Sequence, residues 1–144
     1  MQVTPLGKTG LSVSRLGAGL ARIGIELTLA DVEEAGQVLN AALDDGINFL
    51  DTAACYDISE ELVGRTVAHR RDEYILATKC GHVTGGVSGK PWSSQTIQDS
   101  IDRSLERMRT DRLDLVQLHS CDGEILERGE AVEALLEAKR AGKT

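Results

Sequence analysis

Four short apolar runs alternate with four segments of helical periodicity along the chain, and this alternation limits the fold more than any other feature. The expected strands are residues 14–19, 48–53, 74–79 and 113–119. The expected helices are residues 32–45, 59–69, 94–109 and 130–141. Strands that alternate with helices across short connections form right-handed crossovers and a parallel sheet. We therefore expect an α/β fold whose strands, such as the run Tyr74-Ile75-Leu76-Ala77, are buried on both faces.

A single domain is expected, because no linker, low-complexity stretch or internal repeat interrupts residues 1–144. Residues 2–13 predict a short β-hairpin at the start, with Gly7 and Gly10 in its turn. A closed (β/α)8 barrel usually has about 250 residues, so four β/α units correspond to the first half of such a TIM barrel.

A half-barrel leaves two sheet edges open, and open edges invite pairing with another chain. The sequence therefore leaves two alternatives for its quaternary state. The chain is either a truncated piece of a full barrel or a half-barrel that covers its edges by self-association.

Charge and cysteine content narrow the class of partner. The net charge of −7 repels phosphate groups, so neither nucleic acid nor an anionic membrane is expected as a partner. The three cysteines are odd in number and lack a Cys-x-x-Cys spacing, which argues against a disulfide framework and a zinc finger. Reduced thiols, and the lack of a long apolar run or a secretion leader, predict a cytoplasmic protein.

Polar side chains stand at the ends of successive expected strands. Asp51 lies near the end of the second strand, Lys79 ends the third and His119 ends the fourth, while Tyr56 follows the second strand by a few residues. The carboxyl ends of parallel strands meet at one rim, where active sites of barrels are found. Each residue alone has an ordinary structural explanation, but their occurrence at successive strand ends favours a shared catalytic site.

Together these four groups suit the delivery of a proton to a carbonyl oxygen. A free tyrosine keeps its proton up to about pH 10, and a neighbouring ammonium favours the phenolate and so eases proton release. We expect Asp51 to keep Lys79 charged, Lys79 to assist Tyr56, and a neutral His119 to hydrogen-bond the substrate oxygen. Such a site supplies an acid and an oxyanion pocket but no hydride, so it requires a nicotinamide cofactor.

The sequence around these positions resembles the aldo-keto reductase family over essentially the whole chain. The similar stretches are residues 5–17, residues 46–56 followed by Ser59, Glu60 and Gly64, residues 75–79 and residues 113–119. In chain order they are similar to the family's N-terminal hairpin and first strand, the segment of its catalytic Asp and Tyr, and the strands of its Lys and His. Asp57 stands where the family often has glycine, so the loop shape there is expected to differ.

The resemblance implies an NADP(H)-dependent oxidoreductase that reduces an aldehyde, ketone or sugar carbonyl to an alcohol. It implies that Tyr56 is the general acid, that Asp51 and Lys79 tune it, and that His119 orients the substrate. It also implies that Gly19, Leu20 and Asp51 line the nicotinamide ribose of NADP(H), with NAD(H) as the alternative cofactor. Because other cofactor contacts of the family lie on later strands, the second interpretation is a non-catalytic half-barrel or assembly module, and a redox-sensing regulatory subunit is a third.

Residues 81–89 are predicted to form a long flap on the substrate side of the rim, because long loops at this edge are usually functional or mobile. Trp92, just after this loop, either lines the substrate pocket or packs at the start of the third helix. The segment Gly17-Ala18-Gly19 begins like a dinucleotide fingerprint, but Arg22 replaces its third glycine, so a strand end is expected instead.

Cysteine and histidine also follow three of the expected strands. Cys55, Cys80, Cys121, His82 and His119 would suit a soft metal ion if they met at one point. Their scattered spacing favours separate, partly buried thiols instead. The sequence therefore predicts no metal site.

Overall fold

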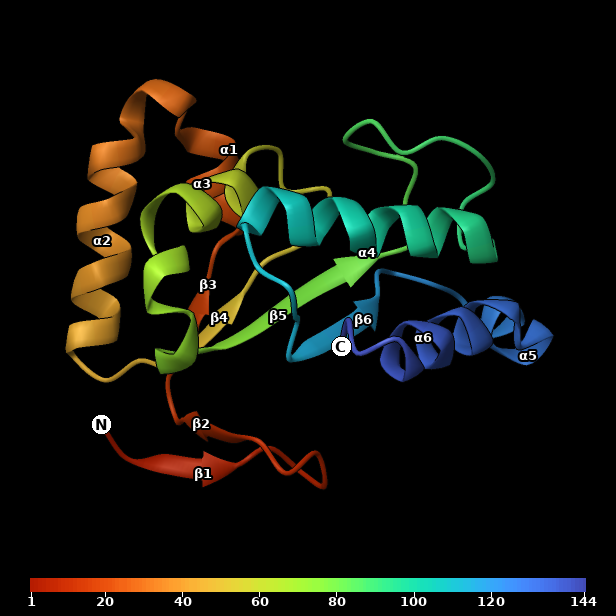
Figure 1. Cartoon of the computed structure of the whole chain (residues 1–144), viewed down its shortest axis with the longest axis horizontal. Helices are drawn as coiled ribbons and strands as arrows, with labels where there is room; N and C mark the ends of the chain where they lie inside the picture. The colour runs from red at the N-terminus through yellow and green to blue at the C-terminus, as the bar shows by residue number, and fades with distance from the viewer.

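The computed structural model describes residues 1–144 and contains two β-sheets (Figure 1). A two-stranded antiparallel sheet is made of β1 (Val3–Pro5) and β2 (Ser12–Ser14). A four-stranded parallel sheet has the order β3 (Ala18–Gly19), β4 (Phe49–Asp51), β5 (Ile75–Cys80) and β6 (Leu115–Leu118). The predicted hairpin and the predicted parallel sheet are both confirmed.

Six α-helices accompany the parallel sheet, four of them between its strands and two after β6. They are α1 (Ala21–Glu26), α2 (Val32–Asp44), α3 (Ser59–Thr66), α4 (Ser94–Met108), α5 (Gly123–Arg128) and α6 (Glu130–Arg140), with 3₁₀ turns at Leu29–Asp31 and Ala68–Glu73. In Figure 1, α2, α3, α4 and α6 follow one another in the order of the strands, and successive members of this row are in contact. At the two ends of the sheet, β3 and β6 each pair on one side only.

The hydrophobic core lies between the parallel sheet and these helices. Leu50 of β4 and Leu76 of β5 are fully buried and pack with Leu39, Val63 and Ile97 from three of the helices. Because side chains alternate along a strand, the neighbouring positions point to the opposite face of the sheet. The sequence of each strand therefore supplies apolar side chains to the helix layer and leaves the alternate positions free for the polar residues of the rim.

The hairpin is attached at the end of the sheet where the strands begin. Asn48, which precedes β4, accepts the N–H of Ser14 through its side chain at 2.6 Å and donates to the carbonyl of Ser12 at 3.1 Å. The backbone N–H of Asn48 also donates to the Ser14 hydroxyl. The hairpin thus lies opposite the carboxyl ends of the strands, as Figure 1 shows.

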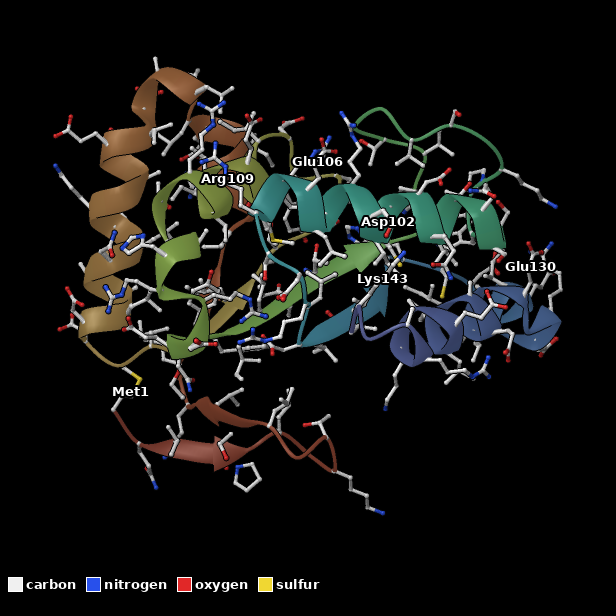
Figure 2. The ribbon with its side chains drawn as sticks, in the orientation of Figure 1. Met1, Asp102, Glu106, Arg109, Glu130 and Lys143 are labelled. Atoms are coloured by element: carbon white, nitrogen blue, oxygen red, sulfur yellow. The ribbon has the colours of Figure 1, made fainter.

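Polar contacts fix the last helix against α4. Figure 2 shows Lys143 and Asp102 side by side, and these residues form an ion pair between the C-terminal segment and α4. At the other end of α6, the Glu130 carboxylate accepts the N–H of Ser94 at 2.8 Å. The two ends of α6 therefore each have a polar contact with α4, which fixes α6 against α4.

Three expectations about elements differ from the structure. The strand expected over 14–19 is divided, because Ser14 belongs to the hairpin and only Ala18 and Gly19 pair with β4. Helices α1 and α5 were not predicted, since six residues are too few to show a helical stripe. The expected helix 59–69 ends at Thr66, and a 3₁₀ segment follows it.

None of the helices combines the length and the apolar composition that are needed to span a membrane.

Apolar side chains remain uncovered on the two outermost helices. Val38 of α2 is 55% exposed, and Leu136 of α6 is 44% exposed. Each of these helices lies at one end of the row formed by α2, α3, α4 and α6. The open flanks of the molecule are therefore apolar as well as unpaired.

Candidate active site

An ion pair between Lys79 and Asp51 lies at the carboxyl ends of β4 and β5. The Lys79 ammonium donates to Asp51 Oδ1 at 2.9 Å, to Asp51 Oδ2 at 2.8 Å and to the Thr52 carbonyl at 2.8 Å. The strand register explains this meeting, because Asp51 pairs with Ala77, two residues before Lys79. Side chains two residues apart on a strand share a face, so both groups leave the sheet on the side away from the helices.

Tyr56 lies beside this ion pair. The ring centroid of Tyr56 is 4.9 Å from the Lys79 Nζ atom, within the range of a cation–π contact. The turn that carries Tyr56 is closed by its N–H, which donates to the Ala53 carbonyl at 3.0 Å, and by its carbonyl, which accepts the Ser59 N–H at 2.9 Å. These two local hydrogen bonds shape the turn that holds the phenol at the rim.

Asp57 adopts a backbone conformation that is typical of glycine, the residue that the family often has at this position. Its φ of 43° falls in the left-handed region that glycine favours. Aspartate is among the non-glycine residues most often found in that region. The backbone shape that a glycine would allow is therefore kept at this position.

His119 completes the group from the end of β6. Its ring meets the Tyr56 ring edge-on, with centroids 5.7 Å apart and planes at 88°. Burial, together with the nearby His82 and the Lys79 ammonium, lowers the pKa of His119 below its ordinary value, while Asp51 opposes this. The imidazole is consequently neutral at neutral pH and can either donate or accept a hydrogen bond. The structure thus brings Asp51, Lys79, Tyr56 and His119 to one rim.

The loop that carries Tyr56 is supported by buried hydroxyl groups. The Thr52 and Ser59 hydroxyls lie 2.7 Å apart and form a hydrogen bond, and the Ser59 hydroxyl also donates to the Leu20 carbonyl at 3.1 Å. Helix α1 packs directly on this turn, since a Cβ at Gly24 would overlap the carbonyl oxygen of Tyr56. These contacts fix the height of the phenol above the sheet.

A buried carboxylate supports the same loop from below. Glu60 is 1% exposed, accepts the Thr78 hydroxyl at 2.7 Å and lies 3.4 Å from the guanidinium of Arg107 on α4. Arg107 also donates to the carbonyls of Ala54, at 3.3 Å, and Gly85, at 2.7 Å. One cation therefore links the Tyr56 loop to the loop after β5.

Sequence reasoning assigned no role to these supporting residues. Ser59, Glu60 and Gly64 belong to a stretch that resembles the family, so the resemblance did point to these three residues. Gly64 allows α3 to approach α4, because a Cβ there would overlap the carbonyl of Arg107. For Arg107 itself, the sequence carries no signal, since its partners lie far away in the chain.

The three predicted cofactor positions lie in different surroundings. Gly19 pairs with Asp51 at the rim, is exposed and has open space where a side chain would stand. Asp51 is 35% exposed, so its carboxylate can still accept a hydrogen bond from a hydroxyl group. Leu20 is buried in the core, and its N–H donates to the Asp51 carbonyl at 2.9 Å. Open space beside a partly exposed carboxylate fits the ribose end of a nicotinamide cofactor.

Residues 81–92 form a loop that closes on itself beside the rim. The Trp92 N–H donates to the Gly81 carbonyl at 2.8 Å, and the Trp92 ring meets the His82 ring edge-on with centroids 5.5 Å apart. The next residue, Ser93, caps α4 by accepting the N–H of Thr96. Trp92 therefore packs at the start of α4 and against the loop, and its assignment to a substrate pocket stays a prediction.

Comparison with known proteins places this geometry in a family. A family model described as the aldo/keto reductase family matches residues 15–144. The chain is 38% identical over 148 residues to the uncharacterized oxidoreductase YqkF of Bacillus subtilis, covering 99% of this chain and 46% of that protein. It is 33% identical over 151 residues to L-galactose dehydrogenase of Arabidopsis thaliana, covering 100% of this chain and 46% of that protein.

Solved structures agree with the sequence relatives. An aldo-keto reductase of Bacillus halodurans, in its holo form, superposes with a TM-score of 0.86 at 34% identity and covers 99% of this chain and 47% of that one. The chain thus spans about half the length of the relatives it matches. This confirms the prediction that its four β/α units correspond to half of a barrel. The chain belongs to the aldo-keto reductase family.

Proposed function

We propose that this rim is the catalytic site of an NADP(H)-dependent oxidoreductase that reduces an aldehyde, ketone or sugar carbonyl to an alcohol. The observation that carries the proposal is the ion pair of Lys79 and Asp51 beside the ring of Tyr56, with the ring of His119 in edge-on contact with that ring. These side chains come from three separate strand ends, and a purely structural ion pair would not require the phenol and the imidazole.

Each group has a defined task in this proposal. The Tyr56 hydroxyl donates its proton to the carbonyl oxygen as the alcohol forms, and the Lys79 ammonium stabilises the phenolate left behind. Asp51 keeps Lys79 in place and charged. His119, neutral because of its lowered pKa, donates a hydrogen bond that orients the carbonyl oxygen. The reduced nicotinamide, when bound, supplies the hydride for the carbonyl carbon.

The nicotinamide end of the cofactor would lie against Gly19 and Asp51. The ribose hydroxyls are suited to the exposed side of the Asp51 carboxylate, and Gly19 leaves the space that the ring and ribose need. Leu20 would contribute through its backbone and by holding the end of β3 in the core. We propose NADP(H) as the cofactor, as the family resemblance implies. NAD(H) is the alternative, because neither Gly19 nor Asp51 would contact the part of the cofactor in which the two differ.

A second candidate function follows from the open flanks of the structure. An apolar groove runs between the hairpin and the β6 edge, where it is lined by Leu11, Leu115, Val116, Leu135 and Leu136. Together with the half-length match to its relatives, this groove favours a non-catalytic half-barrel or assembly module that associates through its edges, including with a second copy of itself. The two candidates differ in whether the chain binds NADPH.

One set of measurements tests both candidates. Titration of the chain with NADPH, followed by cofactor fluorescence, and an NADPH oxidation assay with 4-nitrobenzaldehyde should show binding and turnover. Tyr56→Phe should lower kcat by about 100-fold or more, as expected for the loss of a general acid. Tyr74→Phe is the matched control, because Tyr74 is buried just before β5, at the end of the sheet opposite the rim, and its hydroxyl donates only to the Val67 carbonyl, at 3.3 Å.

The outcomes separate the two candidates. Unchanged turnover in Tyr56→Phe would refute the role of Tyr56. An unmodified chain that neither binds NADPH nor turns over would refute the reductase proposal for this chain. In that case, a dimer in size-exclusion chromatography with light scattering would support the assembly module.

A further inference from the structure

We propose that Cys55, His82 and His119 form a binding site for a zinc-like transition-metal ion at the edge of the rim. One ligand atom from each residue lies within 4.8 Å of the other two. Cys55 Sγ and His119 Nδ1 are 3.2 Å apart. A thiol and two imidazoles are a donor set that suits Zn²⁺.

The sequence analysis predicted no metal site, because the candidate ligands are scattered along the chain. The structure brings three of these ligands together. Cys55, His82 and His119 follow β4, β5 and β6 respectively, so three neighbouring strands bring them together despite their scattered spacing. Cys80 and Cys121 do not join them. Cys80 is the last residue of β5, and its side chain packs into the core.

The separation of the Cys55 and His119 ligand atoms is close to that in a zinc site. With Zn–S near 2.3 Å and Zn–N near 2.0 Å, tetrahedral geometry requires about 3.5 Å between sulfur and nitrogen and about 3.3 Å between the two nitrogens. Cys55 and His119 therefore already stand at nearly the required separation.

The ring of His82 needs one adjustment. The His82 and His119 rings are stacked, with centroids 4.7 Å apart and planes at 17°, so their lone pairs do not aim at one point. A turn of the His82 ring about its Cβ–Cγ bond corrects this, and that torsion is broad for histidine.

The local charges permit a cation at this point. Lys79 is the nearby cation, and both oxygens of Asp51 neutralise it. The charges that act on the Cys55 thiol also include the carboxylates of Glu60 and Asp57. Binding of the ion releases the thiol proton of Cys55 to solvent. The three ligands are all half-buried, which leaves a fourth coordination position open to water, as in sites with three protein ligands.

Metal titration of the full chain tests the proposal. With thiols kept reduced by a phosphine, ZnCl₂ should bind at one ion per chain in calorimetry. CoCl₂ should give the near-ultraviolet charge-transfer band of a cobalt–thiolate bond. His82→Ala and Cys55→Ser should each weaken Zn²⁺ binding by about tenfold or more, since even partners outside the coordination shell contribute that much. Cys55→Ser should also remove the cobalt band.

Two variants serve as matched controls. Cys121→Ser removes another half-exposed thiol that follows a strand, and His69→Ala removes the one histidine outside the cluster. Both should keep the affinity and the cobalt band. A saturated unmodified chain without a thiolate band would overturn the proposal, as would equal Zn²⁺ affinity in His82→Ala and the unmodified chain. The readout is metal binding, so the result is independent of any reductase activity.

Discussion

The Lys79 ammonium is held by both carboxylate oxygens of Asp51, at 2.9 Å and 2.8 Å, and its side chain is only 16% exposed. Only the Thr52 carbonyl also accepts from it. Because the cation is less exposed than the carboxylate, the loss of either partner should have a different cost in stability. Removal of the carboxylate leaves a charge without its counterion, whereas removal of the ammonium leaves a carboxylate that water can reach.

We therefore predict that Asp51→Asn lowers the free energy of unfolding by about 1–3 kcal/mol, which is the cost of an unsatisfied, partly buried charge. Lys79→Met should cost less than Asp51→Asn, because it removes the buried charge and fills its space. Urea denaturation followed by circular dichroism measures both. Glu26→Gln is the control, since the exposed Arg22–Glu26 pair should contribute less than about 1 kcal/mol. Equal losses in Asp51→Asn and Glu26→Gln would contradict the prediction.

The second prediction concerns the contact between α3 and α4. A Cβ at Gly64 would overlap the Arg107 carbonyl and the backbone of Met108, which cannot move without shifting α4. Gly64→Ala should therefore destabilise the chain by about 2 kcal/mol or more through overpacking. Thermal unfolding of this variant should show a lower midpoint.

A second glycine-to-alanine change isolates the steric cause. Gly123, at the start of α5, has open space at its Cβ position and a φ outside the left-handed region. Gly123→Ala should be neutral or stabilising by up to about 1 kcal/mol, because alanine restricts the unfolded chain. Should the two variants unfold at the same temperature, close packing at Gly64 would not be the reason for its glycine.

The sequence was sufficient to predict that Asp51, Lys79 and His119 meet, and the reason is geometric. Each stands at or just beyond the end of a strand in a parallel sheet, and such ends meet at one rim. Side-chain alternation then decides the face, and the register pairs Lys79 with Gln117, two residues before His119. These facts follow from the strand pattern and need no knowledge of the loops.

The conformations of the loops could not be predicted from the sequence. The convergence of Cys55 and His82 depends on the turn after β4 and on the way Trp92 closes the loop after β5. Backbone angles in these turns, such as the positive φ of Trp92, are decided by contacts with distant residues. The helix α1 was missed because its six residues are too few to show a helical stripe, and its place depends on the close approach of Gly24 to the Tyr56 turn.

The third prediction ranks the three thiols by their reactivity. Burial raises the pKa of Cys80 to about 12 and also raises the pKa of Cys55 above its ordinary value. Only the thiolate attacks a disulfide reagent, so a higher pKa and less exposure both slow the reaction. At pH 8 the expected order of labelling is Cys121 first, Cys55 second and Cys80 last.

Mass spectrometry of the native chain after timed exposure to a thiol reagent measures this order. Cys80 should react at least about 100-fold more slowly than Cys121, given its pKa near 12 and its 2% exposure. In denaturant all three should react at similar rates, which controls for the reagent. Fast labelling of Cys80 in the native chain would show that its surroundings open.

The last prediction concerns Arg107, the guanidinium beside the buried Glu60. Arg107→Met leaves the Glu60 carboxylate with only the Thr78 hydroxyl and also frees the carbonyls of Ala54 and Gly85. A buried charge that loses its partner costs about 3–5 kcal/mol, and the long 3.4 Å contact between Glu60 and Arg107 places the expected loss near the lower end.

The double variant Glu60→Gln with Arg107→Met decides whether charge is the cause. It should be more stable than Arg107→Met alone, because the neutral amide no longer needs a counterion. Arg103→Met is the matched control, since Arg103 stands one turn earlier on α4 and is 46% exposed. It too donates to the Gly85 carbonyl and pairs with the exposed Glu106, so any loss it shows measures the loop contact together with an exposed ion pair. A double variant no more stable than Arg107→Met would mean that Arg107 acts through the loop carbonyls and not through the Glu60 carboxylate.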